Sequence, residues 1–188
     1  MKFLYRYSNI LDLKARKTLC SALIQSHFDY SCSSWYSGLN KGLKRKLQII
    51  QNKMVRFILN LDSRAHIGCK ELEQLNMLNV PNRVKQIKLT HMFKIWNKTS
   101  PEYLFDNFLK ISDTALRHCT RASANNFFLP RVQGNCCNTF FYSAIKDWNS
   151  LPSETKQIQI LSTFKERVKE NISLEARNTE SCSFLFFS

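Results

Sequence analysis

The amino-acid sequence predicts a mainly α fold, a helical bundle with an irregular basic loop before its C-terminal helices. Only four Gly and four Pro occur among 188 residues, so few residues interrupt a helix. Apolar residues recur at steps of three and four along several segments, which is the spacing of one helical face. Hydrophobic residues make up 44% of the chain. This proportion is enough to fill a core, so we do not expect wholesale disorder.

The clearest helix is predicted between residues 39 and 61. Its apolar stripe consists of Leu39, Leu43, Leu47, Ile50, Met54, Phe57 and Leu61. At about 100° per residue, Lys41, Arg45, Asn52 and Arg56 fall together on the opposite face. Most basic faces of this kind are only solvated surface, and a surface that binds phosphates is the alternative.

Similar periodicity predicts further helices on both sides of this one. They cover residues 12–35, 69–78, 79–96, 99–109, 139–151 and 161–172. Pro81 and Pro101 stand in first turns, where a missing N–H removes no helical hydrogen bond. Ser100 and Ser162 are placed to cap the helices that follow them. The expected inward positions near the C-terminus are Phe164, Val168 and Ile172, together with Phe140, Phe141, Ala144, Ile145 and Trp148.

Residues 112–137 break this pattern. The segment is polar and basic and contains Asn-Asn, Gly and Pro, which are typical of loops. We expect a short extended piece within it at "NFFLPRV". The chain therefore divides into a helical region over 1–98, a second helical region over 99–174, and a tail over 175–188 that we expect to be disordered.

The charge balance indicates a partner rather than a fold. The chain has 28 Lys and Arg against 14 Asp and Glu, a formal net charge of +14. Such an excess predicts binding to polyanions, with nucleic acid first and an anionic membrane surface second. The side chains that we expect to neutralise phosphates are Lys41, Arg45, Arg56, Arg83, Arg121 and Arg131. Exposed Tyr or Phe near an arginine would stack on unpaired bases.

The sequence predicts neither a catalytic site nor a cofactor. Two-metal chemistry needs carboxylates close together, and the six aspartates are isolated from one another. Phosphate-loop, metalloprotease and nucleophile-elbow motifs do not occur. His118, Cys119, Cys136 and Cys137 are potential zinc ligands, but adjacent ligands suit a tetrahedral site poorly. Buried or incidental thiols explain these cysteines better.

The chain is expected to be intracellular, and its sequence does not distinguish nucleus from cytoplasm. Arg6 interrupts the early apolar residues, which argues against a signal peptide. No apolar run approaches the roughly 20 residues of a membrane helix. We therefore expect no membrane-spanning helix and no membrane partner.

The stretch "HFDYSCSSWYSG", residues 27–38, contains the residue types of metal and nucleophile sites. We interpret it instead as a packing motif at the junction of two helices. Tyr30 and Trp35 are expected to fill the wedge between those helices, because a buried aromatic side chain removes a large apolar area from water.

Six segments, in this order, resemble the C-terminal region of jockey-like non-LTR retrotransposon reverse transcriptases. They are "LIQSHFDYSCSSWYSG", "LQIIQNKMVRFILN", "LEQLNMLNVPNRVKQIKLTHMFKIWNKTSPEYL", "TR…LPR", "FFYSAIKDWNSLP" and "TFKERVK". Two departures are Ser26, where the family commonly has Pro, and Ser143, where Gly is usual.

The resemblance implies a thumb-like region over 1–98 that helps to hold template and primer, without the palm and its metal-binding aspartates. It implies RNA or an RNA–DNA duplex as partner, together with a palm domain supplied by the full-length polymerase. The chain would then be no enzyme by itself. Two alternatives stay open at this point. One is a degenerate mobile-element remnant that acts at most as a protein-interaction or structural module, and the other is a polymerase completed by another chain.

Overall fold

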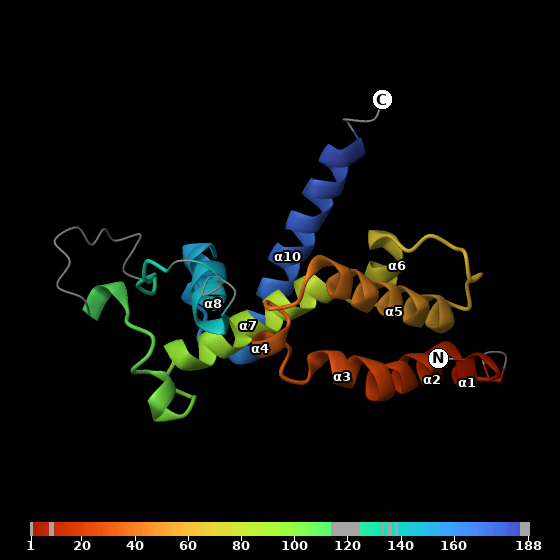
Figure 1. Ribbon diagram of the computed structural model, residues 1–188, viewed down its shortest axis with the longest axis horizontal. Helices are drawn as coiled ribbons and strands as arrows, with labels where there is room; N and C mark the ends of the chain where they lie inside the picture. The colour runs from red at the N-terminus through yellow and green to blue at the C-terminus, as the bar shows by residue number, and fades with distance from the viewer. Residues whose placement is uncertain are drawn as a thin grey trace. The chain divides into compact units, whose positions relative to one another are not determined.

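The computed structural model describes residues 2–7, 10–113, 125–132, 134, 137 and 139–184. Among these residues the chain is mainly helical and forms no strand, which confirms the predicted fold class (Figure 1). The predicted extended piece is represented by one antiparallel bridge between Lys110 and Phe127. The chain divides into two compact units, Met1–Val84 and Lys85–Ser188.

The first unit is built from short helices around one long helix. Its elements are α1 (Lys2–Tyr5), α2 (Leu13–Cys20), the π-helical turn η1 (Ser21–Gln25), α3 (Ser26–Asp29), α4 (Cys32–Trp35), α5 (Lys41–Leu59), α6 (Cys69–Gln74) and the first turn of α7 (Val80–Trp96). The second unit contains the rest of α7, the 3₁₀ turns η2 (Glu102–Leu104) and η3 (Ile111–Asp113), α8 (Phe140–Asn149), α9 (Ser153–Lys156) and α10 (Leu161–Phe184).

Helix α5 begins and ends with local signals that confirm the predicted element. The side chain of Asn40 accepts a hydrogen bond from the backbone N–H of Leu43 at 2.8 Å, which satisfies a free donor of the first turn. Asn60 ends the helix in the left-handed conformation at φ 54°. In Figure 1, α2 and α6 lie on different sides of α5. Short helices therefore cover α5 on more than one side along part of its length.

The core of the first unit lies on one face of α5. Met54, Val55, Phe57 and Ile58 are almost fully buried there, and the cluster continues into Cys20 of α2 and Leu72 and Leu75 beside α6. Burial raises the pKa of the Cys20 thiol to about 11. Cys20 is therefore a small apolar core residue rather than a nucleophile.

The buried face of α5 differs from the predicted stripe by a rotation. Leu43 and Ile50 are 43% and 38% exposed, and Leu61, which lies beyond the end of the helix, is 37% exposed, whereas Gln51 is only 1% exposed. The side-chain amide of Gln51 donates to the carbonyl of Leu78 at 2.8 Å and accepts from Gln48 Nε2 at 3.0 Å. A buried amide with both ends bonded is stable in a core. The predicted stripe was wrong at these positions, because hydropathy alone cannot anticipate such a bond.

The helix predicted over residues 12–35 is interrupted. Asp12 caps α2 by accepting from the backbone N–H of Ala15 at 2.7 Å, and regular α-helix ends at Cys20. After α3, Tyr30 has extended backbone and Ser31 is left-handed at φ 47°. Trp35 Nε1 donates to the Tyr30 carbonyl at 2.8 Å, which satisfies an oxygen that a continuous helix would have used.

An aromatic cluster forms the core of the second unit. Trp148 and Phe164 have no exposed surface, and their ring centroids are 6.0 Å apart. The later part of α7 contributes Phe93, 4.4 Å from the Phe164 ring, and Trp96, 5.7 Å from the Trp148 ring. This packing explains why the division between the units falls at residues 84 and 85, inside α7, and not at the predicted 98/99.

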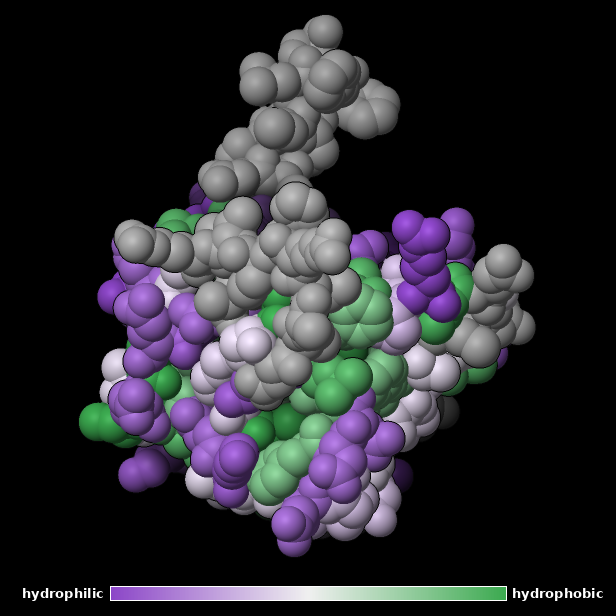
Figure 2. All heavy atoms as spheres, turned by 90° about the vertical axis from the view of Figure 1, so that its left-hand side faces the viewer, coloured by the Kyte–Doolittle hydropathy of each residue, from purple (hydrophilic) through white to green (hydrophobic). Residues whose placement is uncertain are grey.

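Polar side chains attach the extended segment of the second unit to α8 and α9. The Asn149 amide bonds both backbone groups of Phe127, accepting from the N–H at 3.0 Å and donating to the carbonyl at 2.9 Å. Lys156 Nζ donates to Asn126 Oδ1 at 2.7 Å, and burial lowers the pKa of this lysine. Next to the bridge, Leu109 and Phe128 remain 54% and 39% exposed. Figure 2 shows apolar side chains on one face of the molecule, bordered by hydrophilic ones.

Two predicted segments of the second unit differ from the structure. Residues 99–109 form only the 3₁₀ turn η2, because the backbone at Pro101 is extended (ψ 143°) and starts no α-helix. Helix α10 continues through Phe184, whereas a disordered tail was predicted from residue 175. Its sequence contains no Gly or Pro that would end the helix. The predicted inward residues Phe164, Val168 and Ile172 are all buried. Residues 185–188 lie outside the described residues.

In the part of the chain that the structure describes, every helix is too short or too polar to cross a bilayer.

Replacing Gln51 by alanine is expected to lower the free energy of unfolding by about 2 kcal/mol, because the Leu78 carbonyl loses its buried donor and a void remains. Urea denaturation of the full chain measures this change. Gln74 is exposed, so Gln74→Ala is the matched control and should change stability by less than about 0.5 kcal/mol. Equal effects of the two substitutions would contradict the structural role of Gln51.

Candidate nucleic-acid interface

The positive charge of the chain is concentrated in its first unit. Residues 1–84 contain 14 Lys and Arg against 5 Asp and Glu, a net charge of +9 out of the +14 of the whole chain. The potential around a surface follows the local excess of charge, within a Debye length of about 8–10 Å in physiological salt. An anionic partner is therefore attracted most strongly to this unit.

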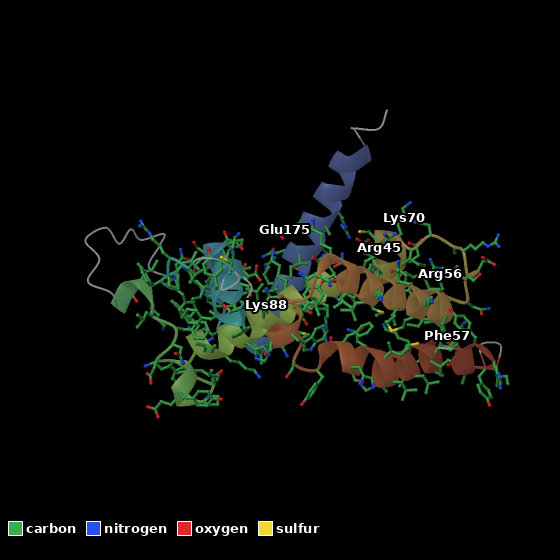
Figure 3. All side chains as sticks on the ribbon, viewed as in Figure 1. Arg45, Arg56, Phe57, Lys70, Lys88 and Glu175 are labelled. Atoms are coloured by element: carbon green, nitrogen blue, oxygen red, sulfur yellow. The ribbon has the colours of Figure 1, made fainter. Side chains whose placement is uncertain are left out.

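Helix α5 carries six Lys and Arg and no Asp or Glu among its 19 residues. Four of these cations are exposed, and at about 100° per residue they lie within an arc of about 140°. We call these four residues the cationic face: Lys41, Arg45, Lys46 and Lys53. Figure 3 shows Arg45 and Phe57 on opposite sides of α5, Phe57 on the side of α2. The core contacts of α5 therefore direct its cations away from the interior.

No acidic side chain neutralises the cationic face within the described part of the chain. The ion pairs found there involve other cations, namely Arg83, Lys85, Lys88 and Arg167. Like charges four residues apart on a helix, such as Lys41 and Arg45, destabilise it by about 0.2–0.5 kcal/mol. A bound anion would remove this repulsion. The arrangement thus favours a ligand with repeated negative charges.

The structure brings together two of the six residues predicted to bind phosphates, Lys41 and Arg45. Arg56 is half-buried, and its Nε donates to the carbonyl of Ala65 at 2.7 Å. This bond ties the loop after α5 to the helix, so Arg56 has a structural role. Arg131 is exposed in the second unit, and Arg121 lies outside the described residues.

Arg83 is held by a carboxylate of its own unit. Its Nη2 lies 2.8 Å from Asp29 Oδ2, and its Nε donates to Asp29 Oδ1 at 3.2 Å. Gln25 Nε2 donates to the same carboxylate at 2.9 Å. A two-point pair of this kind holds the guanidinium in one orientation and offsets its charge. We therefore leave Arg83 out of the cationic face.

Sequence reasoning missed Lys46 and Lys53, which lie at the edge of the same face. A usable signal was present, because residues 41–59 contain no acidic residue. A purely solvated helix usually mixes charges of both signs. Lys44 was missed as well, and its Nζ lies 5.3 Å from the centre of the Tyr36 ring.

The stretch "HFDYSCSSWYSG" contains the end of α3, the whole of α4 and the corner between them. Cys32 and Ser33 are buried there, and Trp35 is half-buried. Burial, followed by the nearby charge of Asp29, raises the pKa of the Cys32 thiol. Tyr30 is 79% exposed, so the prediction that it fills the wedge was wrong. The left-handed backbone at Ser31 turns Cys32 inward and leaves Tyr30 outside.

Among the described residues, no three His, Cys, Asp or Glu side chains gather closely enough to hold a metal ion. The candidate ligands His118, Cys119 and Cys136 lie outside these residues. Comparisons with family models, curated proteins and solved structures gave no match to this chain. The candidate nucleic-acid interface therefore rests on the geometry of α5 and the charge of the first unit.

We expect Asp29 and Arg83 to be energetically coupled, because each loses its partner when the other is replaced. The coupling free energy from Asp29→Ala, Arg83→Ala and the double variant should be about 1 kcal/mol, the upper range for a partly exposed pair. Urea denaturation supplies the four unfolding free energies. Effects that simply add would show that the pair contributes nothing to the corner.

Proposed function

We propose that this chain is a non-catalytic fragment of a non-LTR retrotransposon reverse transcriptase that binds template and primer nucleic acid. The observation that carries the proposal is the cationic face of α5, which is exposed and has no acidic partner among the described residues. The resemblance of six ordered segments to the region behind the polymerase palm supports it. We assign the chain no catalytic residue and no cofactor, and RNA or an RNA–DNA duplex as partner.

The mechanism is the neutralisation of phosphates with release of condensed counterions. From Lys41 to Lys53 the helix rises about 18 Å at 1.5 Å per residue. Along one strand of a duplex, phosphates follow one another at about 3.4 Å of axial rise, so this length spans about five of them. Four cations on such a face can therefore meet a continuous backbone rather than a single anion.

The pair of substitutions Lys41→Gln and Arg45→Gln should weaken binding to an RNA–DNA duplex. It should also reduce the slope of log affinity against log salt by about two, because each lost phosphate contact changes that slope by about 0.9. Fluorescence anisotropy over a series of salt concentrations measures both quantities.

The matched control is the pair Lys146→Gln and Lys165→Gln, two exposed lysines of the second unit. Both pairs lower the net charge equally, but the control pair should leave the slope unchanged. If both pairs changed the slope to the same extent, binding would depend on diffuse charge and not on α5. Absence of binding at low salt would reject the proposed function itself.

A second function, as a protein-interaction module, is favoured by apolar side chains exposed on the first unit. Ile10, Leu13 and Leu23 are 78%, 46% and 54% exposed. Surfaces of this kind mark docking sites when they are contiguous. A docking module without nucleic-acid affinity would give no anisotropy change at low salt, so the same titration distinguishes the two functions.

A further inference from the structure

We infer that Tyr30 is a base-stacking residue, and that it gives the first unit a preference for nucleic acid with unpaired bases. The inference rests on the proposed function and adds a ligand class to it. The cationic face would bind any phosphate backbone, whereas an aromatic ring distinguishes bases that are free to stack from bases that are already paired. The residues that carry the inference belong to the corner between α3 and α4 and to the start of α5.

Tyr30 lies on the surface next to a buried part of the corner. Its side chain is 79% exposed, whereas Cys32 and Ser33, two and three residues further along the chain, are 1% and 8% exposed. Folding normally gains free energy by burying a tyrosine, about 25 cal/mol for each Å² of apolar surface. At this corner the tyrosine ring is not buried, so that free energy is not gained, and the ring is accessible to a ligand.

The backbone that presents Tyr30 is held from several directions. Its N–H donates to the carbonyl of Ser26 at 3.0 Å, and its carbonyl accepts from Trp35 Nε1 at 2.8 Å. The preceding residue, Asp29, is held by Arg83. A tyrosine has only two side-chain torsions. Ligand binding therefore costs little conformational entropy at this residue, which favours affinity.

A chain of contacts joins this corner to the cationic helix. Trp35, whose indole bonds the Tyr30 carbonyl, has its ring 6.1 Å from the ring of Tyr36. Lys44 Nζ lies 5.3 Å from the centre of the Tyr36 ring. On α5, Lys44 stands between Lys41 and Arg45 in sequence. The rings of Trp35 and Tyr36 and the Lys44 ammonium group thus connect the Tyr30 carbonyl to the first turn of α5, in a unit of net charge +9.

This combination identifies the chemical class of the ligand. Proteins that bind single strands place aromatic rings beside a positively charged track, so that bases stack while the backbone is neutralised. Every base has a π face, so such binding tolerates different sequences. We assign to Tyr30 an unpaired nucleobase of a strand whose phosphates lie on the cationic face.

The test compares one RNA–DNA duplex with and without a single-stranded overhang, titrated with the full chain by fluorescence anisotropy. Tyr30→Ala should weaken binding to the overhang substrate about tenfold and leave binding to the blunt duplex unchanged. Tyr30→Phe should retain the affinity, because the ring alone stacks. Tyr30→Leu, which keeps bulk without a π face, should behave as Tyr30→Ala does.

Tyr103→Ala is the matched control, since this tyrosine is 68% exposed but belongs to the second unit. It should change neither affinity. The inference would be overturned by an equal effect of Tyr30→Ala on both substrates, by no effect on the overhang, or by a loss with Tyr30→Phe. If the unaltered chain bound neither substrate, the proposed function would fall as well. If the unaltered chain bound both substrates and Tyr30→Ala changed neither affinity, the inference about Tyr30 would be rejected and the proposed function would stand.

Discussion

The burial of one face of α5 is the constraint on which the first unit depends. Met54, Phe57 and Ile58 point into a core shared with α2 and α6, and each buried side chain of this size contributes about 1.5–3 kcal/mol. Rotating the helix would expose all three and remove the buried partner of Gln51. The helix therefore has one stable orientation, and that orientation decides which side chains face solvent.

The orientation separates two kinds of basic residue. Arg56 and Arg83 use their planar guanidinium groups to bond a loop carbonyl and the Asp29 carboxylate, which are structural tasks that a lysine performs less well. The exposed cations of α5 have no such task. A bound anion would relieve the repulsion among them, and the proposed nucleic-acid function provides one. Charge alone would not distinguish the arginines that have structural bonds from the exposed cations of α5. The hydrogen-bond and ion-pair distances do.

The sequence predicts those parts of the fold that depend on local periodicity and fails where distant partners decide. Phe164, Val168 and Ile172 were assigned correctly to a buried stripe because each lies one turn from the next. The pairing of Asp29 with Arg83, 54 residues apart, has no local signal in the sequence. Because of this pairing, Arg83 is not one of the unpaired cations that were predicted to bind phosphates. Tyr30 was expected inside because aromatic residues usually are. The left-handed backbone of Ser31 leaves the Tyr30 side chain outside, and no Gly or Pro beside this serine predicts a turn.

The central claim is that the exposed side of α5 is the surface that contacts nucleic acid, and lysine footprinting tests it most directly. The full chain is acetylated briefly with and without a saturating RNA–DNA duplex, and the modified lysines are quantified by mass spectrometry. Protection of Lys41, Lys46 and Lys53, with Lys146 and Lys165 equally reactive in both samples, is the predicted result. Protection confined to the second unit, or spread evenly over all exposed lysines, would contradict the account.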